Sequence, residues 1–417
     1  MANTVNLANV LLSLSDAIDL ASGTISRHQL RTAYIACELG MRAALTPSLL
    51  DRLFIAALFH DIGAITVEEK VALFEFENVN VLPHSLRGEL LMRRVPMFMP
   101  VAGIIGNHHR EWREWDRPIG DPDVLLAQII CLADHVARLI KAKAHVLHQY
   151  KDISEIISSW SGTIFNPGIV DKFLVLSTRE EFWLNIVNPR LYSLLFNEGP
   201  LRRAEICFDD MEIVSLFFKD IIDLKSPFTA THSTGVSACA DALSTLMGAS
   251  DDERLKIRIA GNLHDLGKLV IPNSILEKQG RLSIEEYQVI KSHTYYSFTI
   301  MNSIADFRDI AEWGSFHHER IDGSGYPFHH SGDRLSAQAR IIAVSDVFTA
   351  LAEDRPYRKG MGRADVLGIM GDMAAKGKLD AATLRRLADN YQEIADRWFE
   401  AQAKARDFYN RQFAVIQ

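Results

Sequence analysis

The stretch RIAGNLHDLGKL, residues 258–269, decides the fold of the C-terminal half, because it sets His264 and Asp265 side by side in an apolar helical segment. An imidazole and a carboxylate that are buried together cost several kcal/mol unless they are paired or bind a metal ion. The stretch FIAALFHDIGAI, residues 54–65, contains the same His-Asp pair. The chain therefore holds two copies of a pattern that favours metal binding.

The two stretches belong to an internal repeat. DAIDLASGTISRH, residues 16–28, aligns without gaps with DIIDLKSPFTATH, residues 220–232, at an offset of 204 residues (220 − 16). The distance from the histidine that ends each segment to the next His-Asp pair is 32 residues in both copies (60 − 28 and 264 − 232). A constant offset over this length is typical of duplicated domains.

Two later pairs of segments extend the repeat. GNHHREW, residues 106–112, matches SFHHERI, residues 315–321, and QIICLADHV, residues 128–136, matches ARIIAVSDV, residues 339–347. The offsets there are 209 (317 − 108) and 212 (346 − 134), so the second copy has gained a few loop residues. Four matches in the same order indicate two domains of common ancestry.

The expected domains are residues 1–200 and 206–417, joined by FNEGPLRRAE, residues 196–205, whose Gly-Pro pair breaks a helix. Apolar residues recur at helical spacing ahead of the first histidine of each copy. They are Leu7, Val10, Leu11, Leu14 and Ile18 in one copy and Ile213, Val214, Phe217, Ile221 and Leu224 in the other. This pattern predicts an all-α protein and leaves room for a short β-hairpin.

Composition and charge narrow the class of protein. Apolar residues make up 48% and charged residues 24% of the 417 residues, which is typical of a globular protein with buried cores. The net charge of −8 argues against a nucleic-acid polymer as partner. The four scattered cysteines favour a reducing compartment, and neither a signal peptide nor an apolar run of membrane-spanning length is evident. We expect a cytoplasmic protein without a membrane partner.

The C-terminal copy contains seven candidate metal ligands. They are His232, His264, Asp265, His293, His317, His318 and Asp346. Imidazole and carboxylate groups suit iron, manganese or zinc, and seven ligands suit two ions that share a bridge. Asp265 is the natural bridge, because a carboxylate has two oxygens. Such a pair of ions can hold a hydroxide that attacks phosphorus while the ions stabilise charge on the phosphoryl oxygens.

Four motifs of the C-terminal copy resemble the HD-GYP family. They are HDLGK (264–268), HHERIDGSGYP (317–327), ARIIAVSDVFTAL (339–351) and RPYR (355–358). The resemblance implies a pair of HD-type helical bundles, the N-terminal one degenerate. It also implies a phosphodiesterase that opens cyclic di-GMP or 3′3′-cyclic GMP-AMP to a linear dinucleotide. Both substrates remain candidates.

The resemblance also assigns roles to single residues. His232, His264 and Asp346 would hold one metal ion, and His293, His317 and His318 a second ion, with Asp265 bridging the two. The ions would be iron or manganese. Lys268 and Asp265 are the expected catalytic residues, since Lys268 resembles the family lysine at the scissile phosphate. The expected substrate contacts are Arg320, Tyr326, Arg355 and Arg358.

Two positions depart from the family pattern. Phe228 stands four residues before the first histidine, where members with three metal ions carry a glutamate, which favours two ions. Thr349 replaces a frequent aspartate three residues after Asp346, which puts one ligand contact in doubt.

The N-terminal copy retains a full set of potential ligands but lacks the catalytic motifs. The set is His28, His60, Asp61, His84, His108, His109 and Asp134. Ala64 takes the place of the lysine, and REWREWDRPIG, residues 110–120, replaces the GYP loop. Loss of the lysine removes a cation that would stabilise the charge developing on a phosphoryl group, so we favour a regulatory domain over an active one. The retained histidines indicate that this domain binds metal. A second hydrolase with altered specificity is the competing interpretation.

Three functions compete for the whole chain. Hydrolysis of a cyclic dinucleotide leads. A catalytically weak cyclic-dinucleotide receptor that signals through a protein partner is the main alternative. A phosphohydrolase of mononucleotides is disfavoured by the GYP and RPYR motifs. A homodimer or a regulatory protein partner is compatible with each function.

Overall fold

The computed structural model describes residues 4–19, 27–74, 82–141, 143–225, 231–354 and 359–412. These residues form two compact units. We call residues 6–205 the N-terminal unit, and residues 206–412 together with residues 4–5 the C-terminal unit. The predicted all-α fold is confirmed, because almost all regular structure in the described residues is helical.

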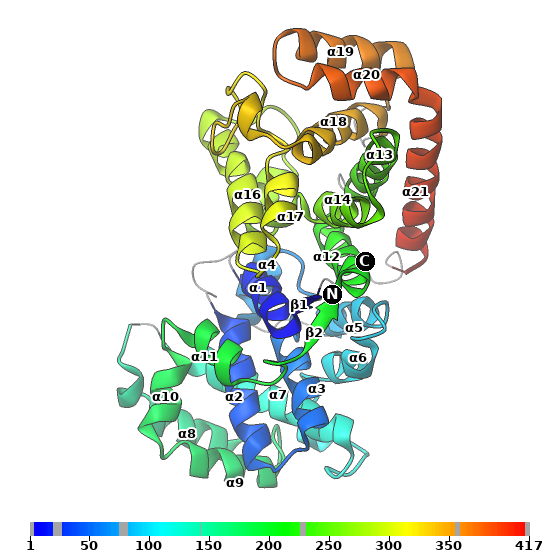
Figure 1. Ribbon diagram of the computed structural model, residues 1–417. Coiled ribbons are helices and arrows are strands. Elements are labelled where there is room, and N and C mark those ends of the chain that lie inside the picture. Colours follow the sequence, from blue (N-terminus) through cyan, green and yellow to red (C-terminus); the bar gives the residue numbers. More distant parts are fainter. Residues whose placement is uncertain are drawn as a thin grey trace. The chain divides into compact units, whose positions relative to one another are not determined.

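The N-terminal unit is a bundle of helices (Figure 1). The α-helices are α1 (Leu7–Asp19), α2 (His28–Arg42), α3 (Pro47–Leu58), α4 (Val67–Phe74), α5 (Leu82–Met92), α6 (Met99–Gly106), α7 (Pro122–Leu139), α8 (Tyr150–Ser159), α9 (Pro167–Leu176), α10 (Glu180–Ile186) and α11 (Leu191–Glu198). Two 3₁₀ turns, η1 (Trp112–Glu114) and η2 (Val146–His148), lie on either side of α7 in the sequence.

The C-terminal unit repeats this plan. The α-helices are α12 (Phe208–Leu224), α13 (His232–Leu246), α14 (Asp251–Leu263), α15 (Asn273–Leu276), α16 (Ile284–Asn302), α17 (Arg308–Ser315), α18 (Ala337–Ala352), α19 (Arg363–Ala375), α20 (Ala381–Asp389) and α21 (Tyr391–Gln412). The 3₁₀ turns are η3 (Leu266–Val270) and η4 (Gly332–Arg334). In chain order, α1, α2, α3, α5, α6 and α7 correspond to α12, α13, α14, α16, α17 and α18, as the internal repeat predicts.

Instead of the short β-hairpin for which the sequence left room, the described residues contain a small sheet between two distant strands. The two strands in this part of the chain, β1 (Thr4–Asn6) and β2 (Glu205–Cys207), do form a two-stranded sheet. However, almost the whole N-terminal unit lies between them in the sequence. They therefore join the start of the described chain to the segment that leads into α12, instead of forming a local turn.

Helix starts follow local capping chemistry. Ser250 begins α14 and Ser283 begins α16, each in a capping box with the glutamate three residues later. Ser336 caps α18 by accepting a hydrogen bond from the Ala339 backbone amide. These three helices carry or precede metal-ligand candidates, so their starts fix where those side chains lie.

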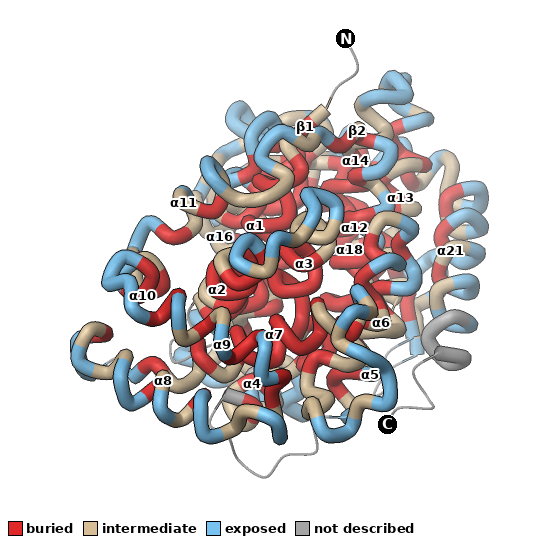
Figure 2. The backbone as a smooth tube through the Cα atoms, turned by 90° about the horizontal axis from the view of Figure 1, so that it is seen from below, coloured by how far each residue is buried: buried red, intermediate tan, exposed pale blue. Residues whose placement is uncertain are grey.

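Buried residues concentrate on the helices that repeat between the units. In the C-terminal unit α13 packs against α14, α18 and α21, and in the N-terminal unit α2 packs against α3 and α7. Figure 2 shows α3 and α7 largely buried, whereas α8 exposes much of its surface. None of the described helices is long and apolar enough to cross a bilayer.

Candidate metal centre

The seven predicted ligands of the C-terminal unit lie within five helices or directly after them. They are His232 at the start of α13, His264 and Asp265 directly after α14, His293 within α16, His317 and His318 directly after α17, and Asp346 within α18. Six of the seven residues are buried, and His318 is partly exposed. Packing of five helices thus brings these side chains together.

One group of ligands contains His232, His264 and Asp346, whose ligand atoms all lie within 4.8 Å of one another. Nε2 of His232 is 3.1 Å from Oδ1 of Asp346. A group of this size and composition fits one divalent ion.

A second group contains His293, His317 and His318. Nε2 of His293 is 3.4 Å from Nε2 of His317. The side chain of His318 is 34% exposed, and its Nδ1 lies 4.0 Å from Oδ2 of Asp346. This second group therefore opens toward solvent on the side of His318.

Asp265 lies between the two groups. Its Oδ2 is 3.1 Å from Nε2 of His264, whereas its Oδ1 is 3.3 Å from Nε2 of His293 and 3.9 Å from Nε2 of His317. The two oxygens of one carboxylate thus face different groups. This is the arrangement that a bridging ligand requires.

Backbone carbonyls orient the imidazoles. Nδ1 of His264, His293 and His317 lies 2.8, 2.6 and 2.7 Å from the carbonyl oxygen of the residue three positions earlier. A carbonyl oxygen only accepts, so each Nδ1 carries the proton and donates it. Each Nε2 is left with a lone pair that points into the cluster, as a metal ligand needs.

Gly267 explains the glycine of the HDLGK motif. A Cβ at this position would lie 1.9 Å from the carbonyl oxygen of His293. Only glycine lets η3 come this close to α16, which carries His293. Gly63 is under the same constraint in the N-terminal unit, where a Cβ would lie 2.0 Å from the carbonyl oxygen of His84.

The charges of the site are strongly coupled. Burial alone would lower the pKa of His232, but the carboxylates of Glu353 and Asp346 outweigh it and raise that pKa to about 10. Burial alone would raise the pKa of Asp265, but the neighbouring His264 helps to hold that pKa well below its usual range. Burial alone would also raise the pKa of Asp346, but the hydrogen bond from His232 helps to hold that pKa below its usual range as well. Both carboxylates of the cluster are therefore ionised at neutral pH, as metal ligands must be.

Sequence reasoning missed Glu353. Its Oε1 lies 3.1 Å from Nδ1 of His232, and its Oε2 accepts a 3.3 Å hydrogen bond from Gln402. The side chain is 5% exposed. Glu353 follows Asp346 by seven residues, two turns of α18, and this spacing was the available signal. Glu353 orients His232 and makes it more basic.

Lys268 lies beside the bridge. Its Nζ is 2.5 Å from Oδ2 of Asp265, and its side chain is 21% exposed. The residue belongs to the 3₁₀ turn η3, not to a continuous α-helix running on from His264. The ammonium group is nevertheless next to the carboxylate and within reach of solvent.

The GYP loop folds back onto a ligand candidate. The amide of Tyr326 donates to the carbonyl of His318 at 3.2 Å, and the two rings have centroids 4.9 Å apart. A Cβ on Gly325 would lie 2.4 Å from Cα of Glu319, so the loop needs glycine there. Buried Glu319 accepts hydrogen bonds from the amides of residues 328 and 330. Tyr326 is therefore held at the open side of the cluster.

The three predicted arginine contacts have different outcomes. Arg320 is partly exposed and donates to Oγ of Ser324 within the GYP loop at 3.2 Å. Arg355 and Arg358 lie outside the described residues. Thr349, the departure noted in the sequence, is fully buried in α18.

Comparison with known families decides the identity of the fold. Two profiles of the HD domain match the chain, one over residues 25–139 and the other over residues 217–383. The chain is a tandem HD-domain protein. This confirms the predicted pair of related domains.

Curated relatives extend over both halves of the tandem HD protein. It is 28% identical to the 3′3′-cGAMP-specific phosphodiesterase 1 of Vibrio cholerae over 93% of each chain. It is 27% identical to the 3′3′-cGAMP-specific phosphodiesterase 3 of the same organism, over 88% of this chain and 91% of the relative. A cyclic di-GMP phosphodiesterase of Pseudomonas aeruginosa, PA4108, is 35% identical over 35% of each chain.

A solved structure has the same fold. The cyclic GMP-AMP specific phosphodiesterase V-cGAP3 of V. cholerae superposes with a TM-score of 0.66 at 24% identity. The match covers 94% of the tandem HD protein and 98% of that chain. At this identity the likeness establishes the fold.

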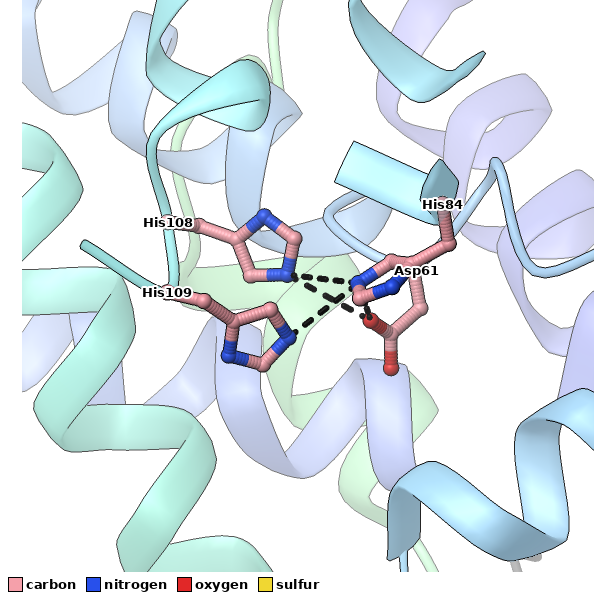
Figure 3. Close-up of side chains that lie close together, drawn as sticks. All are labelled: Asp61, His84, His108 and His109. Carbon is pink, nitrogen blue, oxygen red and sulfur yellow. Dashed lines mark hydrogen bonds and ion pairs between the residues drawn. The ribbon is translucent and has the colours of Figure 1, made fainter. Parts of the chain in front are cut away.

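The N-terminal unit of the tandem HD protein gathers its own ligand candidates. Asp61, His84, His108 and His109 form a group of four whose ligand atoms lie within 4.8 Å of one another, and Figure 3 shows their side chains pointing toward one another. The other predicted ligands, His28, His60 and Asp134, form a separate group of three. All seven predicted side chains of this unit thus belong to one of the two groups.

Sequence reasoning also missed Arg138. Its Nη2 lies 2.6 Å from Oδ2 of Asp134, and its side chain is 8% exposed. Arg138 follows Asp134 by four residues, one turn of α7, so the pair could have been read from the sequence. The N-terminal unit therefore has a cation at a carboxylate that was expected to bind metal.

Replacement of Glu353 should weaken metal binding in the C-terminal unit. Glu353→Gln keeps the shape of the side chain but removes the charge that makes His232 basic. We expect a loss of roughly 10–100-fold in metal affinity, measured by competition with a chelator. Glu393→Gln, on the exposed surface of α21, is the matched control and should bind metal as the native protein does. Equal affinity in both variants would mean that Glu353 does not support His232.

The metal-free protein should lose stability on acidification. Burial lowers the pKa of His84 to about 4, below the ordinary 6.5. Between about pH 4 and pH 6.5 the unfolded state therefore binds a proton at His84 that the folded state does not bind. The contribution is complete above pH 6.5 and is lost as the pH falls toward 4, by on the order of 3 kcal/mol at most.

The measurement is the thermal unfolding midpoint of chelator-treated protein between pH 7 and pH 5. His84→Gln should make the midpoint less dependent on pH, whereas His148→Gln, at an exposed position, should not. A midpoint that does not change with pH in the native sequence would contradict the shifted pKa of His84.

Proposed function

We propose that the C-terminal unit is a metal-dependent phosphodiesterase that hydrolyses a cyclic dinucleotide to a linear dinucleotide. The observation that carries the proposal is the buried cluster of seven ligands with Asp265 between its two groups. The names of the relatives that match over both HD domains support the substrate class. Of the two candidates, they favour 3′3′-cyclic GMP-AMP over cyclic di-GMP.

The donor set fits two divalent ions, iron or manganese. The Nε2 atoms of His293 and His317 lie 3.4 Å apart, and a cation is the natural partner for such an arrangement. His232, His264 and Asp346 would hold one ion, and His293, His317 and His318 the other, with Asp265 shared. When bound, the ions would acidify a shared water that attacks phosphorus and would offset charge on the phosphoryl oxygens.

Lys268 is the residue of this chain best placed to assist the leaving group. Its ammonium is held by Asp265 next to the ligand cluster and remains partly accessible. A substrate phosphate that enters the cluster would meet Nζ as a positive charge and a hydrogen-bond donor. Lys268 would thus stabilise the scissile phosphate and hold the proton that the departing ribose oxygen needs.

Aromatic and basic side chains at the open side of the cluster would bind the nucleotide. Nζ of Lys291 lies 5.2 Å from the ring centre of Tyr287 and 5.3 Å from that of Tyr326. The Tyr326 ring also contacts His318. Rings stack on bases, and cations attract the second phosphate. Arg320 at the base of the GYP loop would add another phosphate contact.

Turnover by the purified full-length protein tests the proposed reaction. Protein loaded with manganese or iron should linearise 3′3′-cyclic GMP-AMP, cyclic di-GMP or both. Asp265→Asn should abolish turnover, because the bridge between the two ligand groups is lost. Lys268→Met should lower kcat by about 10²–10³-fold while keeping the metal content.

Lys404→Met, at an exposed position of α21, is the matched control for Lys268→Met and should leave turnover unchanged. Native turnover in Asp265→Asn would reject the proposed site. Tight nucleotide binding without turnover in metal-loaded native protein would favour the receptor alternative, in which a protein partner reads the bound state.

Removal of the Tyr326 ring should affect substrate binding more than chemistry. Base stacking contributes roughly 1–3 kcal/mol, so we expect Tyr326→Ala to raise KM about 10-fold or more with a smaller change in kcat. Steady-state kinetics on the preferred substrate measure this. Phe399→Ala, an exposed aromatic residue of α21, is the control. An unchanged KM in Tyr326→Ala would exclude the ring as a base contact.

A further inference from the structure

The four side chains Asp61, His84, His108 and His109 of the N-terminal unit lie close together (Figure 3). Oδ1 of Asp61 lies 3.5 Å from Nε2 of His84 and 3.5 Å from Nε2 of His108. Nε2 of His84 lies 3.4 Å from Nε2 of His108 and 3.1 Å from Nε2 of His109. All four ligand atoms therefore surround one small space.

Bond lengths of zinc sites give the expected spacing. With metal–ligand bonds of about 2.0–2.1 Å, the corners of a tetrahedron lie about 3.3–3.4 Å apart, whereas adjacent ligands of a six-coordinate ion lie about 2.9 Å apart. Four of the six distances between the ligand atoms, 3.1 to 3.5 Å, agree with the tetrahedron, and all six lie within 4.8 Å. Four protein ligands would fill such a site and leave no position for water or substrate.

The corresponding side chains of the C-terminal unit are grouped differently. His293, His317 and His318 form a group of three, and Asp265 is grouped with His264 and His317 instead. Asp265 is thus shared between neighbouring groups, whereas Asp61 completes one group of four.

An arginine offsets the negative charge of the remaining ligand candidates of the N-terminal unit, His28, His60 and Asp134. We call these three residues the compensated group. Arg138 contacts Asp134 at 2.6 Å and is fixed by a second hydrogen bond to the carbonyl of Leu73. In the C-terminal unit Ala350 stands at the position of Arg138 in the repeat, and Glu353 adds a negative charge next to His232. One His-His-Asp group thus has an added cation and the other an added anion. A divalent ion would be repelled by the first and attracted by the second.

Little space is left beside the N-terminal cluster. The pocket there has a volume of about 10 Å³, and its lining includes Asp61, His109, Asp134, Arg138 and Lys70. The buried side chain of Lys70 lines this pocket and donates a 2.8 Å hydrogen bond to the carbonyl of Ile18. A volume of this size holds one water molecule or one ion, not a nucleotide.

We propose that the N-terminal unit binds a single metal ion, most suitably zinc, in a closed tetrahedral site made by Asp61, His84, His108 and His109. The ion stabilises the unit and does not act on a substrate, because closed four-ligand sites are structural. Arg138 takes the place of the second ion. This inference does not depend on the reaction proposed for the C-terminal unit.

The metal content of the full-length protein tests the single site. The protein is loaded with zinc, and bound zinc is counted per chain after removal of excess metal. His109→Gln should contain one ion fewer than the native protein, whereas His28→Gln, in the compensated group, should contain the same number. Loss of an ion in His28→Gln, or no loss in His109→Gln, would overturn the assignment.

A second variant keeps the test decisive if His109→Gln does not fold. His109→Cys replaces one zinc ligand with another, so the ion should be retained. After loading with cobalt(II), this variant should show a thiolate-to-metal absorption band in the near ultraviolet and the strong visible absorption of four-coordinate cobalt. Absence of the thiolate band would show that residue 109 is not a ligand.

Replacement of Arg138 tests why the site holds one ion. Arg138→Met frees the Asp134 carboxylate, so we expect zinc content to rise by about one ion per chain. Arg93→Met, which removes an exposed arginine from the same unit, should leave the content unchanged. An unchanged content in Arg138→Met would overturn the role of the arginine, and an equal rise in both variants would show that the effect is nonspecific.

Discussion

The structure depends on one constraint, which is that imidazole lone pairs point at one another inside the protein. Backbone carbonyls accept hydrogen bonds from the Nδ1–H groups of His264, His293 and His317, so the Nε2 atoms face the cluster without protons of their own. Such an array is repulsive unless a cation lies at its centre. Since the ligands come from five helices, any cation that satisfies them also joins those helices. Metal affinity therefore contributes directly to the stability of the bundle.

This constraint explains which parts of the structure were readable from the sequence. The His-Asp pair and the paired histidines are polar residues in apolar helices, and their repetition at a near-constant offset predicted both the fold and the convergence of the ligands. Contacts formed by the ends of elements were less accessible. The position of Glu353 two turns after Asp346 can be read from the sequence, but its contact with His232 depends on the end of α18 meeting the start of α13. The pairing of the two strands could not be read from the sequence, because they lie at opposite ends of the first repeat.

The two units show why a list of ligands does not fix the function of a metal site. Both repeats retain five histidines and two aspartates in corresponding positions. The differences lie in neighbours that carry charge, with Arg138 in one unit and Glu353 in the other, and in how the ligand atoms are grouped. The grouping results from the packing of helices and has no counterpart in a sequence motif. The neighbours, by contrast, lie one or two helical turns from an aspartate and are readable once the helix is known.

The GYP loop links the proposed nucleotide contact, Tyr326, to a candidate metal ligand, His318. The carbonyl of His318 accepts the amide hydrogen of Tyr326, and Gly325 permits the loop to lie directly on Glu319. A metal ion that fixes His318 therefore also restricts Tyr326. By reciprocity, a base that stacks on Tyr326 must favour the same orientation of His318. In the N-terminal unit the GYP loop is replaced, so an ion held by the four candidate ligands would have no comparable connection to a substrate surface. The two proposed sites would thus share a fold and a ligand set while using the metal for structure in one unit and for catalysis in the other.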